Sequence, residues 1–525
     1  MKRKCCLLIA WILTISMVLS GCGIVGMMTS GGVSFSDIEY IRPDVSELSS
    51  AALAVEKKIA QQEDIESLMD GVYAFYEKYH DYYTNYALAN IYYCKDLTDI
   101  YWEQEYNYCL GTAAQVDSLL DNMLYALADC PLRPELEREE YFGAGFFDSY
   151  EGQSVWNDAF VALLEQEAAL EGQYYELSEK ALDFPAYSET FFETCGAQMA
   201  ELLVELVKLR QEIAAEAGYE DYLSFAYDFY YYRDYTPTQA ETLIGEIQKY
   251  LVPLYRDLPE SDTWAQGVGF SSTGETLAYV RDMANAMGGD VKMAFTQMEQ
   301  GKFYDISYGE NKYDASFEIF LSNYAMPYVF VNPQGTEYDH LTFAHEFGHF
   351  CKDYVTGGSM VGVDVAEIFS QGMEYLSLCY GSADHKQLKL TDSLCLYVEQ
   401  AGYASFEQQL YTMEEPTVEK VYALYDKVGK DFGFDVWEWD NRSFVYIPHF
   451  FTDPIYVISY VVSNDTALQF YELEQAETGR GLEKYQDGLS NETLGFLTFL
   501  EDAGLESPFA SGRMEKVAAL LKPYI

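Results

Sequence analysis

Residues 341–349 read Leu-Thr-Phe-Ala-His-Glu-Phe-Gly-His. His345, Glu346 and His349 in this stretch fit the pattern H-E-x-x-H, in which two histidines lie one turn apart on the same face of a helix. Two neutral imidazoles in that arrangement can bind one zinc ion, and the glutamate can reach a water molecule at the metal. The whole chain holds only 6 histidines, so a chance match is a weak explanation. We therefore predict a zinc-binding helix with Glu346 as the general base.

The residues around the motif indicate a helix with one face in the core. An apolar stripe at helical spacing is formed by Phe343, Phe347, Phe350 and Tyr354. The two histidines lie on nearly the opposite face, and Thr336 or Asp339 can cap the start of the helix. One side of this helix is therefore expected to pack and the other to carry the chemistry.

A catalytic zinc ion needs a third protein ligand and one open position. After the Gly357-Gly358 break, residues 364–367 open another helix, on which Glu367 and Glu374 share a face. We expect Glu367 to be the third ligand and Glu374 to orient a histidine from outside the metal site. Asp364 can take a similar outer role or can cap its helix. The predicted cofactor is one Zn²⁺ per chain, held by His345, His349 and Glu367.

Composition and charge restrict the function classes. The chain has 525 residues, of which 49% are hydrophobic, and this is a globular composition. A net charge of −53 argues against nucleic acid as a partner, because the phosphate backbone would be repelled. It argues equally against direct adsorption to anionic lipid. The charge by itself is otherwise typical of a heavily solvated surface.

The first 37 residues are typical of an exported lipoprotein. Lys2, Arg3 and Lys4 precede an apolar stretch over 5–18, and Leu-Ser-Gly-Cys follows at 19–22. This end resembles the lipobox of bacterial lipoproteins, in which the signal is cut before the cysteine and the cysteine receives lipid. We expect a signal peptide over 1–21, lipidation of Cys22 and a tether over 22–37. The protein would then be extracytoplasmic and bound to the bacterial cell membrane through this anchor only.

The chain has 10 cysteines, and loss of Cys5 and Cys6 with lipidation of Cys22 would leave seven. No CxxC pair occurs, so a disulfide framework is not expected. One bridge among Cys94, Cys109 and Cys130 remains open in an oxidising compartment.

Hydrophobic periodicity predicts a mainly α fold with a small β-sheet beside the H-E-x-x-H helix. Helical spacing covers 51–80, 159–183, 196–217 and 274–300, and a Gly- and Ser-containing loop is expected at 257–273. Apolar, β-prone residues predict strands at 303–307 and 326–331, of which 328–331 can pair with a substrate backbone as an edge strand.

Two sets of residues resemble the thimet oligopeptidase and oligoendopeptidase F family of zinc metallopeptidases. The first set comprises 327–332, 335–336, 341–349 and Asp364-x-x-Glu367-x-x-Ser370-Gln371-x-x-Glu374. The second comprises 232–237, 447–450 and 456–460. The resemblance implies a helical ellipsoid with a deep substrate cleft and Glu367 as the third ligand. It divides the chain into an N-terminal helical region, 38–200, and a catalytic domain, 201–525.

The same resemblance suggests that His449, Tyr456 and Tyr460 stabilise the negatively charged oxygen of the transition state, with Tyr460 the preferred tyrosine. One departure is clear. The family often has a further histidine just after the zinc motif, where this chain has Cys351-Lys352-Asp353.

These observations predict a zinc-dependent endopeptidase that cleaves short, unstructured oligopeptides, with a zinc-bound water as nucleophile. One alternative is a peptide-binding lipoprotein without turnover, although an intact Glu346 argues against a pure binder. Another is a different zinc hydrolase, such as a carboxypeptidase or an amidase. Substrate preference and oligomeric state are not readable from the sequence.

The lipid anchor is directly testable through Cys22. We expect Cys22→Ser to release the protein from the membrane or to leave it as uncleaved precursor, because the variant lacks the thiol that receives the lipid. Membrane fractionation and metabolic labelling with a fatty acid measure this outcome. Unchanged lipid labelling of the variant would contradict it.

Overall fold

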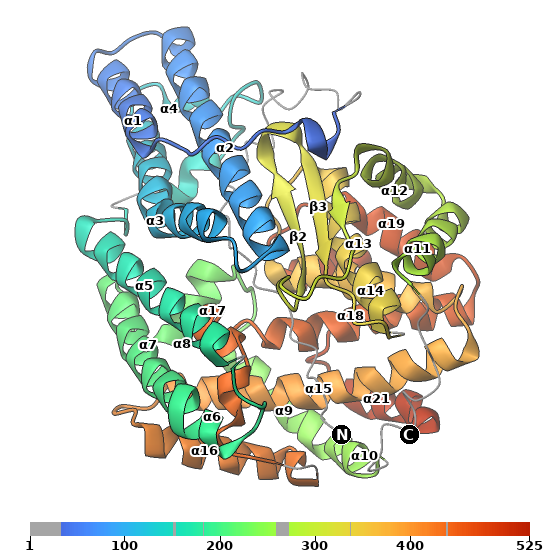
Figure 1. Cartoon of the computed structure of the whole chain (residues 1–525). Coiled ribbons are helices and arrows are strands. Elements are labelled where there is room, and N and C mark those ends of the chain that lie inside the picture. Colours follow the sequence, from blue (N-terminus) through green and yellow to red (C-terminus); the bar gives the residue numbers. More distant parts are fainter. Residues whose placement is uncertain (1–32, 151–153, 182, 259–271, 337, 437–438) are drawn as a thin grey trace.

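The computed structural model describes residues 33–150, 154–181, 183–258, 272–336, 338–436 and 439–525. Helices form most of the molecule and enclose one three-stranded sheet (Figure 1). The predicted fold class is therefore confirmed. The signal peptide and Cys22 lie outside the described residues, as do most of the expected tether and of the loop at 257–273.

The N-terminal helices form a group at one end of the molecule (Figure 1). They are α1 (Val45–Ala60), α2 (Ile65–Lys95), α3 (Ile100–Ala128) and α4 (Arg133–Leu136). These helices bury a hydrophobic cluster of their own, separate from the main core. The single helix expected over 51–80 is in fact two helices. The chain turns at Gln62, which has φ 54°, and Asp64 starts α2 by accepting a hydrogen bond from the backbone N–H of Ser67.

The next helices lead from this group to the sheet (Figure 1). They are α5 (Asp158–Ala181), α6 (Glu189–Phe191), α7 (Ala197–Glu216), α8 (Tyr222–Phe225), α9 (Pro237–Tyr250), α10 (Val252–Arg256), α11 (Thr273–Met287) and α12 (Gly289–Gly301). The helices expected over 159–183 and 196–217 are confirmed. The one expected over 274–300 is split, because Gly288 and Gly289 both have positive φ, 70° and 54°, and interrupt the helix.

The sheet contains β1 (Tyr304–Asp305), β2 (Ser316–Leu321) and β3 (Met326–Val331) in the order β1-β3-β2. β3 pairs in parallel with β1 and antiparallel with β2. Both predicted strands exist, but β2 was not predicted. The expectation that 328–331 forms an edge strand was wrong, because β3 is the central strand and its hydrogen bonds are used on both sides. β1 and β2 are the two edge strands.

Two helices next to the sheet carry the H-E-x-x-H motif and the carboxylates that follow it. They are α13 (Tyr338–Thr356) and α14 (Val363–Ser377), and α14 is buried over its whole length. Of the predicted stripe of α13, the three phenylalanines are buried and Tyr354 is partly buried. The opposite face is buried as well: His345 is 6% exposed and His349 1%. Asp339 accepts hydrogen bonds from the backbone N–H groups of 334–336 and so fixes the turn that precedes α13.

The C-terminal helices cover α14 from the other side. They are α15 (Ala383–Tyr411), α16 (Val418–Asp431), α17 (His449–Thr452), α18 (Ile458–Ala476), α19 (Arg480–Leu489), α20 (Phe496–Ala503) and α21 (Arg513–Leu521). In Figure 1, α18 runs beneath α14, and α15 runs beneath α18. α14 therefore has no solvent-facing side.

Gly348 permits the close approach of α13 to α14. A Cβ atom at this position would overlap the carbonyl oxygen of Phe369 and come within 2.6 Å of the Cα of Ser370. These neighbours are backbone atoms, which cannot rotate away as the end of a side chain can. The glycine in the H-E-x-x-H motif is therefore required by the packing of the two helices.

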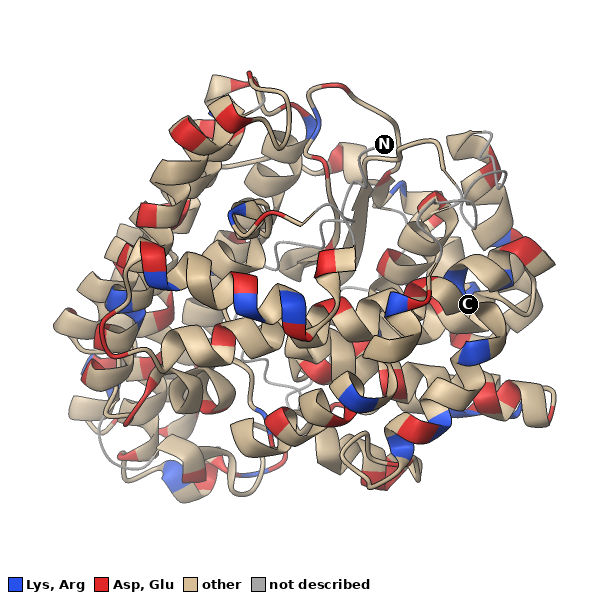
Figure 2. Cartoon of the chain, turned by 90° about the horizontal axis from the view of Figure 1, so that it is seen from below, with Lys and Arg blue, Asp and Glu red and all other residues tan. Residues whose placement is uncertain are grey.

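The surface is acidic over most helices, and Lys and Arg are scattered singly among the acids (Figure 2). The seven cysteines among the described residues are all free, so the possible bridge among Cys94, Cys109 and Cys130 is not formed. Within the described part of the chain, no helix is long and apolar enough to span a membrane.

The packing at Gly348 generates a stability prediction. Gly348→Ala should destabilise the fold by roughly 1–3 kcal/mol, since the added methyl group can be accommodated only if the helices move apart. Gly111→Ala is the matched control, because a Cβ there meets nothing within 4 Å and the position is in the middle of α3. The control should be stabilising by about 0.5–1 kcal/mol. Denaturant unfolding of the two variants decides the question, and equal stabilities would contradict the argument.

Candidate metal centre

His345 and His349 of α13 face Glu367 of α14 across the helix contact. One ligand atom from each residue can be chosen so that all three lie within 4.8 Å of one another, and all three residues are buried. Glu367 Oε2 lies 3.5 Å from His345 Nε2 and 3.7 Å from His349 Nε2. His345 Nε2 is buried and has no hydrogen-bond partner. Two imidazole nitrogens and one carboxylate that converge in this way fit a divalent metal ion with an open position.

The second ring nitrogen of His345, Nδ1, contacts a buried pair of charged side chains. His345 Nδ1 lies 2.8 Å from Glu374 Oε1, and Lys389 Nζ lies 2.7 Å from Glu374 Oε2. A proton on Nδ1 that is donated to Glu374 directs the Nε2 lone pair toward the centre. Glu374 thus lies where the sequence led us to expect it. Lys389 was not anticipated, because it is on α15, and nothing in the sequence relates it to the motif.

Glu367 is also fixed by two hydroxyl groups. Tyr456 donates a hydrogen bond to Oε1 at 2.7 Å, and Ser370 donates one to Oε2 at 2.7 Å. Ser370 belongs to the motif 364–374, but its contact with Glu367 was not predicted. A carboxylate held on both oxygens keeps its orientation before any metal binds.

Burial and neighbouring charges shift the pKa values of these groups in different directions. Burial works to lower the pKa of His345, but the hydrogen bond to Glu374 and the charges of Glu367 and Glu346 raise it to about 9. Burial lowers the pKa of His349 well below its usual value. For Glu374, burial is outweighed by Lys389 and His345, which lower the pKa of its carboxyl group. A metal ion must therefore displace a proton from His345 at neutral pH, and its affinity should rise with pH.

Glu346 lies beside the three candidate ligands and is not one of them. It is 1% exposed, and its Oε2 atom has no hydrogen-bond partner. Burial raises the pKa of Glu346 to about 8, although the charge of His345 and a hydrogen bond with Ser316 of β2 oppose that shift. The group is thus able to gain or lose a proton near neutral pH.

The three residues proposed at the transition state are brought to this centre by α17 and α18. His449 Nε2 lies 3.3 Å from the hydroxyl of Tyr460, and the rings of His449, Tyr456 and Tyr460 contact one another. Burial lowers the pKa of His449 to about 4 and raises the pKa of both tyrosines well above the usual value. At neutral pH the imidazole is neutral, and both hydroxyls keep their protons and can donate.

Asp364 contacts Arg233, not a histidine. The Arg233 guanidinium lies 3.4 Å from Asp364 and donates to the carbonyl of Ile455 and to Ser459. The expected roles of Asp364 next to a histidine or as a helix cap are therefore wrong. Its helix has Gly362 as N-cap, with no side-chain capping bond. Asp364 instead holds the arginine that fixes the segment before Tyr456.

That segment contains a strained residue. Ile455 has φ 66°, which is rare for a β-branched side chain. Its N–H donates to Glu407 at 2.8 Å, and its carbonyl accepts from Arg233 at 3.0 Å. The two buried charges hold a backbone conformation that aims Tyr456 at Glu367.

Lys352 lies in the region where the family often has a further histidine, and its contacts here are structural. Lys352 is buried and donates hydrogen bonds to the carbonyls of Gly488, Leu489 and Asn491 at the end of α19. This position therefore joins α13 to α19 and contributes nothing to the centre itself.

Fold and site together define a helical protein with a buried group of side chains in its core that could hold a metal ion. Residues 35–155 match the model of the Peptidase M3 N-terminal domain. No curated protein matches the chain.

Among solved structures, PZ peptidase A with an inhibitor aligns with TM-score 0.82 and 18% identity over 94% of this chain and 99% of that one. A protein assigned as oligoendopeptidase F aligns with TM-score 0.81 and 19% identity over 94% and 98%. Another so assigned, from Bacillus anthracis, has TM-score 0.77 and 20% identity over 94% and 98%. The chain therefore has the oligoendopeptidase fold over nearly its whole length.

The pair of charges behind His345 generates a prediction about metal affinity. Glu374→Gln should weaken divalent metal binding about 10–100-fold, because the imidazole loses the acceptor that sets its tautomer and orientation. Glu367→Gln removes a candidate ligand and should lower affinity further. Glu105→Gln is the control, a buried carboxylate on α3 that lies in the N-terminal group of helices. Competitive chelator titration measures the affinities. Stoichiometric metal that survives Glu367→Gln and is lost in Glu374→Gln would show that Glu374 is the ligand.

Proposed function

We propose that this protein is a zinc-dependent endopeptidase that cleaves short, unstructured oligopeptides. The observation that carries the proposal is the convergence of His345, His349 and Glu367 with the carboxylate of Glu346 beside them. The oligoendopeptidase fold and the match to the Peptidase M3 N-terminal domain support it.

The ligand set favours zinc. Two imidazoles and one carboxylate are borderline donors that suit Zn²⁺ better than Ca²⁺ or Mg²⁺, which prefer oxygen ligands alone. One ion per chain would be held by His345, His349 and Glu367. When bound, zinc polarises a carbonyl oxygen and lowers the pKa of water toward neutrality.

Glu346 acts as the general base and then as the general acid. Its carboxylate removes a proton from the attacking water as the new carbon–oxygen bond forms at the scissile carbonyl. The same oxygen then delivers that proton to the departing amide nitrogen, which leaves as an amine.

Tyr460 and His449 donate hydrogen bonds to the oxygen on which negative charge develops. Tyr460 suits this role better than Tyr456, because the hydroxyl of Tyr456 already donates to Glu367 at 2.7 Å. Tyr456 then serves mainly to hold the ligand. Both hydroxyls are buried, so water competes weakly for them.

The substrate backbone binds along β2. β2 is one of the two edge strands, and its outer edge has no strand partner among the described residues. Its first residue, Ser316, contacts Glu346, which favours β2 over β1. An extended peptide can add to such an edge through main-chain hydrogen bonds. Because the metal-binding residues are at most 6% exposed, a folded protein surface cannot reach them, whereas an extended chain can.

We further propose that the protein works outside the cytoplasmic membrane, tethered by lipid at Cys22. Residues 2–22 support this location through their basic and apolar pattern and the lipobox-like end. The rival functions are peptide binding without turnover and end trimming by a carboxypeptidase-like zinc hydrolase. Mass spectrometry of a defined peptide digest separates them, because internal cuts, terminal cuts and intact peptide have different masses.

The general base is tested by Glu346→Gln. The variant should keep its zinc, since Glu346 is not a ligand, and should lose about 10²–10⁴ in rate. Zinc content and peptide turnover are measured on the same preparation. Turnover at the parent rate by a zinc-loaded variant would refute the mechanism.

Three Tyr→Phe variants distinguish the tyrosine that donates to the oxyanion from the others. Tyr460→Phe should lower kcat about 10²–10³ with KM and zinc content nearly unchanged. Tyr456→Phe should chiefly weaken zinc binding, because Glu367 loses a hydrogen bond. Tyr397→Phe removes a buried hydroxyl that contacts Asp465, away from the centre, and should leave kcat near the parent value. If Tyr460→Phe kept its single-turnover rate, the donor would lie elsewhere.

A further inference from the structure

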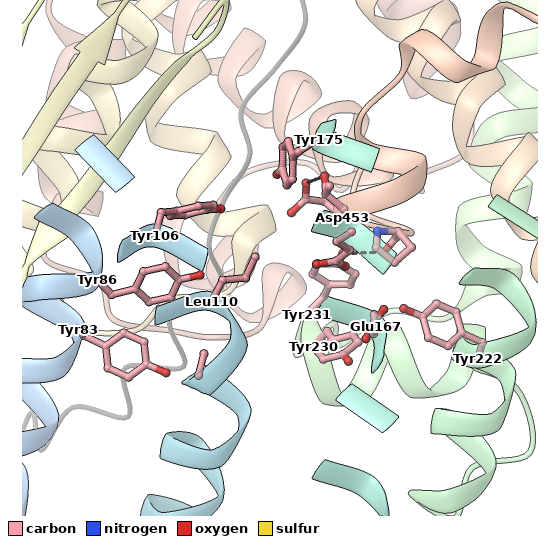
Figure 3. A pocket seen from close by; sticks show the side chains of 14 residues that line it. Tyr83, Tyr86, Tyr106, Leu110, Glu167, Tyr175, Tyr222, Tyr230, Tyr231 and Asp453 are labelled. Carbon is pink, nitrogen blue, oxygen red and sulfur yellow. Dashed lines mark hydrogen bonds between the residues drawn. The ribbon is translucent and has the colours of Figure 1, made fainter. Parts of the chain in front are cut away.

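A pocket lined by aromatic and acidic side chains lies between the N-terminal helices and the rest of the molecule (Figure 3). Its volume is about 190 Å³, whereas a water molecule needs roughly 10–15 Å³ of such space. The walls come from α2 and α3 on one side and from α5, α8, α17 and the segments after α8 and α17 on the other. The lining residues are Tyr83, Tyr86, Tyr106, Leu110, Ala113, Glu167, Glu171, Tyr175, Tyr222, Tyr230, Tyr231, Thr452, Asp453 and Pro454. The pocket therefore has room for a side chain of a bound molecule.

Tyrosines make up half of this lining, and two of them carry polar groups that nothing in the protein satisfies. Tyr86 and Tyr222 are 1% and 0% exposed, and neither hydroxyl has a hydrogen-bond partner. Figure 3 shows their rings on opposite walls, with the Tyr222 hydroxyl directed toward Glu167. A buried hydroxyl without a partner is unfavourable by about 1–3 kcal/mol, so a ligand with polar hydrogens would be stabilised here.

The pocket has more negative than positive charge. Glu167, Glu171 and Asp453 line it, and no lysine, arginine or histidine is among its described lining residues. Arg210 lies behind the wall and pairs with Glu167 and Glu171, and its remaining donors bind Tyr411 and the carbonyls of Phe450 and Phe451. One guanidinium thus faces three carboxylates.

Burial is the main cause of the shifted titration of two carboxyl groups in this pocket. Burial raises the pKa of Asp453 to about 7, although Thr452 and Arg210 act in the opposite direction. Burial and the charge of Glu167 raise the pKa of Glu171 well above its usual value. Carboxylates in such surroundings are stabilised by a cation.

This pocket shares a wall with the metal centre. Tyr231 lines the pocket, donates to the carbonyl of Pro454 at 2.6 Å and has its ring 6.0 Å from that of Tyr456. Tyr456 in turn donates to Glu367. Thr452, at the end of α17, lines the pocket, whereas His449, at its start, faces the centre. A peptide at the metal is therefore close enough for one of its groups to enter the pocket.

We propose that the pocket is a subsite for a cationic group of the peptide substrate, an arginine or lysine side chain or the terminal ammonium. This inference rests on the proposed peptidase function. Carboxylates pair with the charged nitrogens, and tyrosine faces attract the cation through their ring electrons. The protein would consequently prefer peptides in which a cationic group lies at one fixed distance from the cleaved bond.

The test uses wild-type protein with zinc and a set of fluorogenic peptides of equal length. Arginine is moved through every position, and each peptide is compared with its citrulline counterpart, which has nearly the same shape without the charge. N-acetylated and free peptides form a second comparison, which distinguishes a side chain from the terminal ammonium. We expect kcat/KM at least tenfold higher for the cation at one position only.

The general attraction of a chain with charge −53 for basic peptides is a competing explanation. That attraction would favour arginine at every position and would fade with added salt. A buried subsite favours one position and is screened much less. Equal preference at all positions, or none at any position, would overturn the proposal.

Glu171→Gln provides the matched variant, with Glu472→Gln as its control. Glu472 pairs with Arg513 at 2.9 Å much as Glu171 pairs with Arg210 at 3.1 Å, but it is on α18 and does not line the pocket. The arginine-to-citrulline ratio should fall toward one in Glu171→Gln and stay at its parent value in Glu472→Gln. A ratio unchanged in both variants would show that these carboxylates serve only to hold Arg210.

Failure of the proposed peptidase function can be distinguished from failure of the proposed subsite. If no peptide is cleaved, the proposed function fails, and the binding of the same labelled peptides is measured by fluorescence anisotropy. A tenfold tighter binding of the arginine peptide, lost in Glu171→Gln, would still support the subsite. Equal binding of the arginine and citrulline peptides would reject it.

Discussion

The close contact between α13 and α14 at Gly348 is the constraint on which the centre depends. Zinc–ligand distances are only about 2.0–2.2 Å, so ligands from two helices can meet only if the helix axes approach closely. Gly348 has no side chain, and the backbone of residues 369–370 occupies the space where one would be. His345 and His349 therefore face Glu367 across a short gap. The surrounding helices bury this contact on every side and hold it in place.

Burial of so many ionisable groups is unfavourable unless each one is paired. Around this centre the pairing extends outward in layers. Glu374 holds His345, and Lys389 holds Glu374; Ser370 and Tyr456 hold Glu367. The innermost atoms, His345 Nε2 and Glu346 Oε2, are left without hydrogen-bond partners. These two atoms are directed to the position that a metal and its substrate would occupy.

The short segment from α17 to α18 connects the metal centre with the tyrosine-lined pocket. Its residues alternate between the two: His449 and Tyr456 face the centre, and Thr452 and Asp453 face the pocket. Arg210 and Arg233 hold this segment by its carbonyl groups, and Glu407 holds the N–H of Ile455. The interior here contains two arginines, a glutamate and the strained Ile455, all of which are unfavourable for local stability. Their presence indicates that the position of this segment matters more than local stability.

The sequence by itself determined the parts of this protein that depend on local spacing. The i, i+4 pair of histidines, the spacing of Glu367 and Glu374 on one helix and the apolar stripe of α13 follow from helical geometry, which needs no knowledge of neighbours. The mainly α class and two of the three strands were predictable for the same reason. Helix breaks at Gln62 and Gly288 were missed because the hydrophobic pattern continues across them.

Only the tertiary structure decided the rest. It made β3 the central strand, paired Asp364 with Arg233, brought Lys389 to Glu374 and assembled a pocket from α2, α3, α5 and α17. These contacts join residues far apart in the chain, and the partner of a buried charge depends on which helices pack together. Local sequence does not predict that packing. An aspartate that orients a histidine and an aspartate that holds an arginine can have the same neighbours along their helix, so the two roles cannot be distinguished from the sequence.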